Sequence, residues 1–496
     1  MKMSKRPALA FMLLVSLLGS ASQVAAGQPN FIALHPGQFQ EIDQNLQINF
    51  VQYMVEFKGN SLPANLSSRV ASLGGKIIDI MPEMNVVVLA NISESAAATL
   101  RTQSDVADVT TDELISASKE RWHRVRTGSQ PAIAPMSATN PEAAMAFPYQ
   151  WHMRAIKADQ AWQAGYLGSP DVRIAIIDTG IDPTFPDLAG LIDHSRSTSF
   201  CANENQIVEQ QFPGYPLWTD LEDHGTHVAS IAASEGTLLA GVTSHSSLMA
   251  IKALGIVPCP ASSLTRSIYF AANHGADVIN LSLGSAPFRK AGERGNLHYL
   301  HLAIQYALVK GVSAVIVAAG NDTFDFDHSG NFTENLCDVP GVICVSATGP
   351  TDSGPDLLGP FLNVDAAAFY TNFGISAINV AAPGGNLSFD SLGNVTGLSV
   401  VWGACASTDR QFDASGNIVP GQCSSTGLNF AIGIGTSYSV PHVSGLAALL
   451  VSQLGHGHYA QVKAAIENSA DDFGKPGVDP LYGKGRINVA RALGLQ

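Results

Sequence analysis

The sequence predicts an α/β fold in which helices cover both faces of a parallel sheet, giving three layers, with a small α+β unit ahead of it. Apolar runs in the C-terminal two thirds of the chain alternate with helix-like segments. The runs span residues 172–177, 248–253, 278–283, 314–318 and 342–347. Strands buried on both faces have such unbroken apolar runs, and their alternation with helices is typical of a parallel sheet.

The composition is that of a globular chain with several units. Its 496 residues correspond to about three units if each has roughly 150 residues. Hydrophobic residues make up 46% and charged residues 14%, which excludes a disordered chain and a long coiled coil. The formal net charge of −14 disfavours a nucleic-acid partner, because phosphates repel an acidic surface.

Residues 1–26 have the order of an export signal. Basic residues near the start precede an apolar run over residues 8–18. Small residues follow, with Val24 and Ala26 at positions −3 and −1 of a cleavage site before Gly27. A membrane anchor or a buried helix is the alternative, but the run is too short to span a bilayer. We therefore expect a secreted protein with no membrane partner after signal cleavage.

Residues 27–115 form the predicted small unit, whose core spans about 50–115. Its strand-like and helix-like stretches follow the order βαββαβ, a ferredoxin-like pattern. They cover residues 53–57, 66–73, 76–80, 85–90, a helix opened by Ser93, and 106–109. Residues 116–147 lack an apolar period, which is typical of an exposed linker that proteases cut. The larger unit then spans residues 148–496.

The chain has six cysteines, all after residue 200. An exported protein meets oxidising conditions, so an even number of cysteines indicates disulfides. Fifteen connectivities are possible for six cysteines, and the sequence does not choose among them. Our hypothesis pairs neighbours along the chain: Cys201 with Cys259, Cys337 with Cys344, and Cys405 with Cys423.

Three polar residues stand where predicted strands and helices end or begin. Asp178 ends the run at residues 172–177, and open α/β sheets place their sites at the carboxyl ends of such strands. His224 begins a helix-like segment. Ser437 lies at the N-terminal end of an apolar helix, where the helix dipole favours developing negative charge. Each also has a structural interpretation, as a turn acid, a helix-start histidine and a helix-capping serine.

Together these residue types fit nucleophilic catalysis. A serine hydroxyl needs a base, and the base needs an orienting group, so His224 would take the Ser437 proton while Asp178 holds the imidazole. Asn321 follows the run at residues 314–318 and, with the Ser437 N–H, would bind the oxyanion. His227 and His442 are interpreted as structural, because one base suffices.

The motifs around these residues resemble the subtilisin family of serine proteases. Three blocks carry the likeness: Asp178-Thr179-Gly180, His224-Gly225-Thr226-His227-Val228-Ala229, and Gly435-Thr436-Ser437 with Pro441-His442-Val443. The chain order Asp, His, Ser is that of subtilisin. Residues 318–321 resemble the oxyanion block.

The resemblance implies further properties. Extended substrate would pair with residues 280–284, so Ser282, Leu283 and Gly284 are predicted to bind substrate. The small unit would be an inhibitory pro-segment, removed by cleavage in the linker. The chemistry would require no cofactor.

Two calcium sites are considered, both as structural sites. Asp187 matches a calcium ligand of the family, but the segment at residues 234–239 is short where many relatives have a calcium loop. Separately, Asp325 and Asp327 stand at positions 1 and 3 of an EF-hand-like spacing with Gly330 at position 6. Position 12 is Leu336 rather than Glu, and a polar turn is the alternative.

The sequence thus predicts a secreted, monomeric serine endopeptidase that acts on proteins or peptides and is made as a self-processed zymogen. Two alternatives remain at this point. One is a catalytically silent binding protein of the same family. The other is a secreted esterase, although esterases of the α/β-hydrolase type have Gly-x-Ser-x-Gly and the order Ser, Asp, His. The departures Tyr438 and Ser439, where the family usually has Met and Ala, remove no catalytic group.

Overall fold

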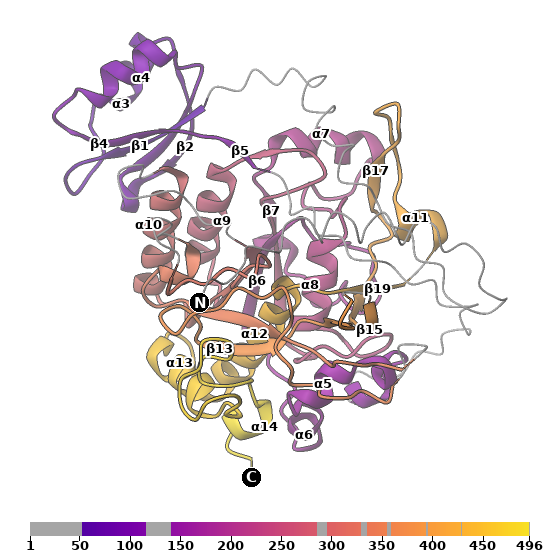
Figure 1. Ribbon diagram of the computed structural model, residues 1–496. Coiled ribbons are helices and arrows are strands. Elements are labelled where there is room, and N and C mark those ends of the chain that lie inside the picture. The colour runs from indigo at the N-terminus through magenta and orange to yellow at the C-terminus, as the bar shows by residue number, and fades with distance from the viewer. Residues whose placement is uncertain are drawn as a thin grey trace.

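A parallel sheet forms the centre of the large unit (Figure 1). The computed structural model describes residues 52–115, 140–284, 295–328, 335–354, 359–392, 395–427 and 429–495. Within these residues the sheet has seven strands in the order β13-β12-β11-β10-β6-β8-β7, and every neighbouring pair is parallel. The strands are β6 (Arg173–Asp178), β7 (Thr198–Ser199), β8 (Ser247–Lys252), β10 (Val278–Gly284), β11 (Ala314–Ala318), β12 (Ile343–Thr348) and β13 (Val380–Pro383). The five runs predicted from the sequence are β6, β8, β10, β11 and β12, with bounds that shift by at most one residue.

Helices cover both faces of this sheet, as the α/β prediction requires. Along β6, Ile174 and Ile176 point into one apolar cluster with α8 and α12, while Ala175 and Ile177 point into another with α9 and α10. Side chains alternate between the two faces of a strand, so both faces are buried and the fold has three layers. The helices are α5 (Trp151–Ala155), α6 (Ala158–Gln163), α7 (Ala202–Gln211), α8 (His224–Ala232), α9 (Ser262–Asn273), α10 (Gly295–Lys310), α11 (Gln422–Thr426), α12 (Thr436–Leu454), α13 (Tyr459–Asn468) and α14 (Val489–Ala492).

Short strand pairs lie outside the two main sheets. They are β14 (Asn386–Phe389) with β15 (Val395–Ser399), β16 (Val401–Ala404) with β19 (Phe430–Gly433), β17 (Arg410–Phe412) with β18 (Ile418–Pro420), and β5 (Leu114–Ile115) with β9 (Cys259–Pro260). The described 3-10 helices are η3 (Pro82–Met84), η4 (Pro141–Ala143), η5 (Phe147–Tyr149), η6 (His194–Arg196) and η7 (Leu336–Asp338). The pair β5–β9 joins the end of the small unit to the large one.

The small unit has the predicted βαββαβ order and lies against α9 and α10 (Figure 1). Its antiparallel sheet has the order β2-β3-β1-β4. The elements are β1 (Gln52–Phe57), α3 (Leu66–Ser72), β2 (Lys76–Met81), β3 (Val86–Ala90), α4 (Glu94–Arg101) and β4 (Val106–Thr111). Helix α4 begins where predicted, because the Ser93 hydroxyl accepts a hydrogen bond from the Ala96 N–H at 3.2 Å.

The two faces of the small sheet are buried differently. One face packs on the unit's own helices, around Leu66 and Leu100. The other face brings Met54 and Val88 into the cluster that also contains Ala303 and Ile304 of α10. The second face of the small sheet is therefore completed by the large unit.

The three predicted disulfides are confirmed. Cys201 pairs with Cys259, Cys337 with Cys344 and Cys405 with Cys423, and all six cysteines lie in the described ranges. They tie together segments that lie 58, 7 and 18 residues apart along the chain. All three lie in the large unit.

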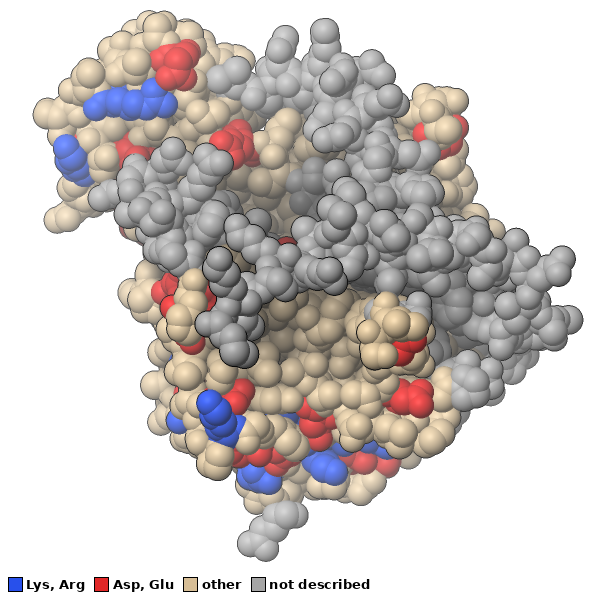
Figure 2. All heavy atoms as spheres, viewed as in Figure 1, with Lys and Arg blue, Asp and Glu red and all other residues tan. Residues whose placement is uncertain are grey.

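The surface agrees with an acidic chain. On the face shown in Figure 2, lysines and arginines stand in small separate groups among aspartates and glutamates. Among the described residues, none of the helices is both long and apolar enough to cross a membrane. The predicted signal at residues 1–26 and most of the linker, residues 116–139, lie outside the described residues.

Candidate active site

Asp178 and His224 meet at the carboxyl edge of the central sheet. Asp178 is the last residue of β6 and is fully buried, and His224 is the first residue of α8. The His224 Nδ1 lies 2.7 Å from the Asp178 Oδ1, which also accepts a hydrogen bond from the Thr179 N–H at 2.8 Å. A carboxylate accepts hydrogen bonds, so Nδ1 carries the proton and Nε2 is the nitrogen that can act as a base.

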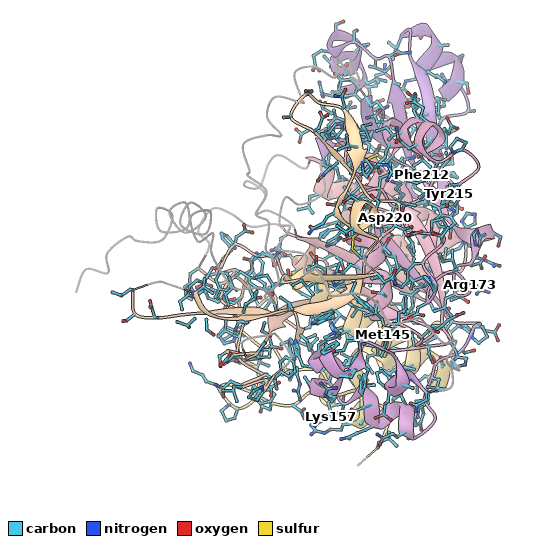
Figure 3. The ribbon with its side chains drawn as sticks, turned by 90° about the vertical axis from the view of Figure 1, so that its right-hand side faces the viewer. Met145, Lys157, Arg173, Phe212, Tyr215 and Asp220 are labelled. Atoms are coloured by element: carbon cyan, nitrogen blue, oxygen red, sulfur yellow. A yellow bond between two sulfur atoms is a disulfide. The ribbon has the colours of Figure 1, made fainter. Side chains whose placement is uncertain are left out.

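The surroundings of His224 favour its protonated form. Burial alone would lower the pKa of the imidazole, but the Asp178 carboxylate and its hydrogen bond raise it, with Glu222 and Asp220 adding to the rise. The net result is a pKa raised from 6.5 to about 9. In Figure 3, Asp220 lies inside the large unit below Phe212 and Tyr215.

Ser437 stands in the first turn of α12, one residue before Tyr438. Helix α12 begins at Thr436, and its residues are buried from Thr436 to Val451. The ring of Tyr438, the next residue, lies 5.7 Å from the His224 ring. The hydroxyl of Ser282, at the end of β10, donates to the Ser437 carbonyl at 2.8 Å. This hydrogen bond holds the start of α12 at the carboxyl edge of the sheet, where β6 ends with Asp178.

Asn321 lies beside the N-terminus of α12. Its Oδ1 accepts hydrogen bonds from the N–H and the hydroxyl of Thr436, each at 2.8 Å. A Cβ atom placed on Gly435 would lie 3.6 Å from the Asn321 Nδ2 and 3.8 Å from the Ser437 nitrogen. The Asn321 amide nitrogen and the Ser437 nitrogen therefore both lie near Gly435, at the N-terminus of α12.

The end of β10 provides backbone beyond the regular ladder. Its pairing with β6 reaches Asn280, and its pairing with β11 shifts register between Leu281 and Gly284. Ser282 and Leu283 therefore have no partner residue in either neighbouring strand, as far as the described ladders extend. Backbone left outside the ladder can pair with an added strand.

A second such edge escaped the sequence analysis. Strand β9 pairs antiparallel with β5, with Leu114 opposite Pro260 and Ile115 opposite Cys259. The Glu113 carbonyl also accepts from the Ala261 N–H at 2.7 Å. A two-residue strand has no periodicity to detect. The prolines on both sides of Cys259 were the available signal, since proline is confined to strand edges.

Two further histidines pack beneath the start of α12. The ring of His227 lies 4.4 Å from that of Tyr438. The His442 Nδ1 lies 2.8 Å from the Tyr438 carbonyl oxygen, and its Nε2 lies 2.8 Å from the His152 Nδ1. Burial lowers the pKa of His442 to about 3, so this ring is neutral. His442 thus links α12 to α5.

The surroundings of Asp187 do not fit a calcium ion. Its carboxylate accepts hydrogen bonds from the backbone N–H groups of Thr237, Leu238 and Leu239 and from the Ser234 hydroxyl. Calcium sites are built from oxygen ligands, whereas this carboxylate faces N–H donors. Burial raises the pKa of Asp187. The short segment that replaces the calcium loop therefore uses Asp187 as an anchor.

Asp325 and Asp327 are also occupied by N–H donors. The Asp325 Oδ1 accepts from the Asp327 and His328 backbones, and Asp327 accepts from the backbones of Ile375 and Ser376. These contacts fit the polar-turn alternative rather than a calcium loop. Residues 329–334 of the proposed loop lie outside the described residues.

Comparison with known proteins decides the family. The model of the subtilase family matches residues 169–485, more than half of the chain. The chain belongs to the subtilase family. Thermitase from Thermoactinomyces vulgaris is 31% identical over 350 residues, which cover 69% of this chain and 95% of thermitase. A thermophilic serine proteinase from a Bacillus species is also 31% identical, over 70% of this chain and 67% of its own.

Solved structures show the same fold as this subtilase. The epidermin leader peptide processing serine protease of Staphylococcus aureus has a TM-score of 0.64 at 22% identity, over 90% of this chain and 98% of its own. Fervidolysin from Fervidobacterium pennivorans has a TM-score of 0.62 at 19% identity, over 96% of this chain and 65% of its own. As a subtilase, the chain is a serine endopeptidase that acts on protein substrates.

Proposed function

We propose that this subtilase hydrolyses peptide bonds through an acyl-enzyme on Ser437, with His224 as general base and acid and Asp178 as the group that orients it. The observation that carries the proposal is the 2.7 Å contact between His224 and Asp178 at the sheet edge to which the start of α12 is fastened. The order Asp, His, Ser along the chain supports it, and it is not the order of α/β-hydrolase esterases.

The chemistry follows from the groups in place. The Ser437 oxygen attacks the substrate carbonyl carbon while its proton passes to the His224 Nε2. The carbonyl oxygen becomes an oxyanion, which the Asn321 amide and the Ser437 N–H stabilise. The imidazolium then gives its proton to the leaving amine as the C–N bond breaks. Water enters by the same base catalysis, releases the acid product and restores the Ser437 hydroxyl.

Substrate backbone would lie between two edges. Residues Ser282 to Gly284 offer the irregular end of β10, and β9 offers a strand edge once β5 has left it. An extended peptide that adds to both edges makes backbone hydrogen bonds, which hold it without requiring a particular side chain. The segments at residues 198–217 and 403–427 flank this region in the chain and are candidates for shaping the cleft.

The small unit would act as an inhibitory pro-segment. Its last described strand, β5, pairs antiparallel with β9, the strand edge to which we propose that a substrate binds. Three carboxylates of the small unit also bind α9 and α10. Asp79 lies 2.6 Å from the Arg266 Nε, Asp112 accepts from the Ser262 N–H at 2.8 Å, and Glu56 lies 2.8 Å from the His298 Nε2. Cleavage in the linker would allow β5 to leave and free β9 for other substrates.

Secretion is part of the same proposal. The order of charges and apolar residues at residues 1–26 is that of an export signal. Three disulfides in the large unit fit an oxidising compartment.

Replacing the nucleophile tests the proposal. We expect Ser437→Ala to lower kcat on the order of 10⁶-fold, to stop cleavage of the linker and to abolish labelling by a fluorophosphonate probe. Ser452→Ala is the matched control, because Ser452 lies on the same helix and bonds only within it, to the Ala448 carbonyl. Peptide hydrolysis retained by Ser437→Ala, at the level of that control, would remove the assignment.

A further inference from the structure

Asp223, the residue directly before His224, has an unusual backbone conformation. Its φ is +93° and its ψ is −26°, in the left-handed region that favours glycine. Asp223 is also the N-cap residue of α8, which starts with the catalytic imidazole. Such a conformation costs free energy and persists only where the surroundings hold it. The question is what holds it in this chain.

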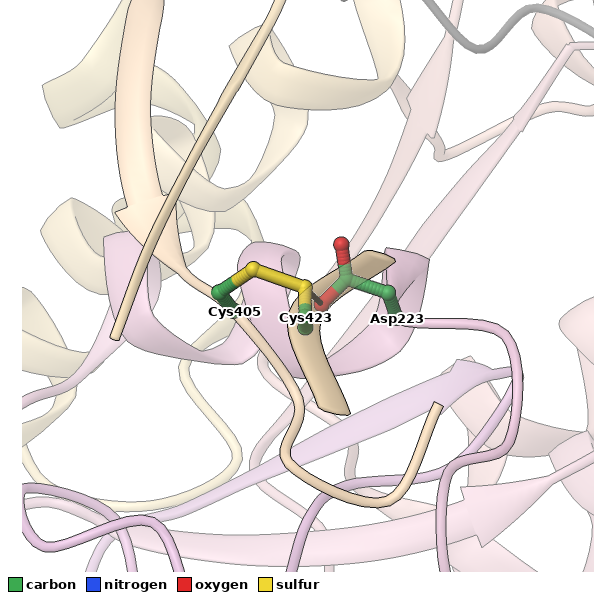
Figure 4. Close-up of side chains that lie close together, drawn as sticks. All are labelled: Asp223, Cys405 and Cys423. Carbon is green, nitrogen blue, oxygen red and sulfur yellow. Dashed lines mark hydrogen bonds between the residues drawn. A yellow bond between two sulfur atoms is a disulfide. The ribbon is translucent and has the colours of Figure 1, made fainter. Parts of the chain in front are cut away.

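The answer lies in the segment at residues 403–427. The Asp223 Oδ1 accepts a hydrogen bond from the Ala406 N–H at 2.5 Å and lies 3.4 Å from the Cys423 Sγ. Ala406 follows Cys405, and the disulfide between Cys405 and Cys423 closes the segment beside the carboxylate (Figure 4). Asp223, Cys405 and Cys423 form the one cluster of potential metal ligands among the described residues. The two sulfurs are bonded to each other, so they are not thiolate ligands.

The same segment contacts the site on both sides of His224. Besides its contacts with Asp223, four residues of the segment donate hydrogen bonds to groups around the imidazole: in the loop after β6, in the turn before α8 and in α8. The contacts are Ala404 N–H to the Ser230 Oγ at 2.8 Å, Ser407 N–H to the Asp182 Oδ2 at 2.7 Å, Thr408 Oγ1 to the Asp220 carbonyl at 2.6 Å and Arg410 N–H to the Leu221 carbonyl at 2.8 Å. These contacts end on the turn that precedes α8, on α8 itself and, through Asp182, on the loop that follows β6.

The segment is also bound to itself. Besides the disulfide, the Asp409 carboxylate accepts from the Cys423 and Ser424 backbone N–H groups, at 3.2 and 2.7 Å. Cys405, Cys423 and Asp223 are all buried. The disulfide and these hydrogen bonds restrain the segment, and Asp223 packs against it.

We propose that Asp223 is a positioning residue for His224, and that the disulfide-closed segment at residues 403–427 acts through it to keep the imidazole aligned with Asp178. This inference rests on the proposed function, because it takes His224 as the base. It assigns a role in the reaction to a segment that touches no reacting atom. A misplacement of about 1 Å at a catalytic group costs on the order of 100-fold in rate.

Loss of the alignment has a signature in the pH dependence. The charged or titratable groups that face His224 are Asp178 on β6, Asp220 and Glu222 on the preceding turn, and Tyr438 on α12. The contact with Asp178 is the main cause that raises the pKa of His224 to about 9. If the imidazole moves away from Asp178, its pKa falls toward 6.5, and the acid limb of kcat/KM moves to lower pH.

Three substitutions at Asp223 separate the possible causes. We expect Asp223→Ala to lower kcat by about 10- to 100-fold, with KM for a short peptide changed less than about twofold, and to move the acid limb to lower pH. Asp223→Asn keeps an oxygen for the Ala406 N–H and tolerates positive φ, so it should stay within about threefold of the parent protein. Asp223→Gly relieves the backbone but lacks the acceptor, so its acid limb should move as in Asp223→Ala.

The disulfide provides an independent arm. The double variant Cys405→Ser with Cys423→Ser should move the acid limb in the same direction, and adding Asp223→Ala to it should change the limb no further. The matched control is Cys337→Ser with Cys344→Ser, which also removes one disulfide of the large unit and should leave the limb in place. If the Cys405 and Cys423 variant does not accumulate in folded form, the Asp223 series decides, since it leaves both sulfurs bonded.

All rates are expressed per active site, titrated with an irreversible serine-directed phosphonate. An acid limb that stays in place in Asp223→Ala, with an unchanged rate per titrated site, would overturn the positioning role. Activity retained by His224→Ala would instead overturn the proposed function. The two failures are therefore distinguishable.

Discussion

The two units of the molecule are stabilised in different ways. The large unit buries both faces of a parallel sheet, holds three disulfides and contains an ion pair between Lys252 and Glu204, 2.6 Å apart and fully buried. The small unit has no cysteine, and one face of its sheet is covered by α9 and α10 of its neighbour. Carboxylates of the small unit also accept hydrogen bonds from α9 and α10 at that boundary.

This difference bears on the proposed removal of the small unit. Removal of the small unit would expose apolar side chains such as Met54 and Val88, but it would break no disulfide and no strand of the central sheet. Interfaces between units of one chain that carry many polar contacts behave like transient protein–protein interfaces. The large unit should therefore keep its chemistry when the small unit dissociates.

The largest expected effect separates chemistry from association. Asp178→Asn should lower kcat about 10⁴-fold, because the imidazole loses the carboxylate that fixes its tautomer. The contacts of the small unit should be unaffected, so after an added protease has cut the linker it should remain bound to the large unit in size-exclusion chromatography. Asp171→Asn, an exposed aspartate just before β6, is the control and should keep full activity. Dissociation of the small unit from Asp178→Asn would contradict this separation.

The next effect compares ion pairs in the two units. Glu204→Leu would leave the Lys252 ammonium buried beside the Thr219 carbonyl without its counter-ion, which should lower the free energy of unfolding by about 3–5 kcal/mol. In the small unit, Asp105 pairs with Arg69 at 2.6 Å but is 45% exposed, so Asp105→Ala should cost less than about 1 kcal/mol. Urea unfolding measures both. Equal losses would mean that burial does not distinguish the two pairs.

The pH dependence of activity should be set by His224 and its neighbours, which all lie in the large unit. The base works unprotonated, and the pKa of His224 is raised to about 9, so kcat/KM should rise with pH and reach half of its maximum near pH 9. Between pH 7 and pH 9 the rise should be about 50-fold. The measurement uses protein whose linker has been cut and whose small unit has been removed. A half-maximum near 6.5 would show that Asp178 does not stabilise the imidazolium.

The smallest effect concerns the boundary between the units. The Tyr299 hydroxyl on α10 lies 3.0 Å from the Met54 carbonyl and 2.9 Å from the Asp108 Oδ2. Tyr299→Phe removes this hydroxyl, which should speed dissociation of the small unit about tenfold after the linker is cut. The rise of activity with time reports the dissociation. Tyr306→Phe, on the same helix but bonded to Asn273 within the large unit, should not change the rate.

The sequence predicted those features that depend on periodicity and motif. The five apolar runs became the central strands because burial on both faces leaves no room for polar side chains, and the order of the small unit followed from its alternating stretches. Asp178 and His224, predicted as partners, lie 2.7 Å apart. These are local patterns or short blocks whose chemistry fixes their position.

Other features depend on contacts that no local pattern contains. The donors around Asp187 are backbone N–H groups whose direction depends on how residues 234–239 fold. The positive φ of Asp223 depends on a segment almost 200 residues further along the chain. The edge strand β9 is defined by its partner β5, not by its own two residues.

The pairing of β5 with β9 has a kinetic consequence. Ile115 is paired with Cys259 of β9 within the same molecule, and the chain that follows it leads to residue 140 of the large unit. If each molecule cuts its own connection, as proposed, the first cut should be a first-order event whose half-life stays the same on dilution. Later cuts between separate molecules would slow in proportion to concentration.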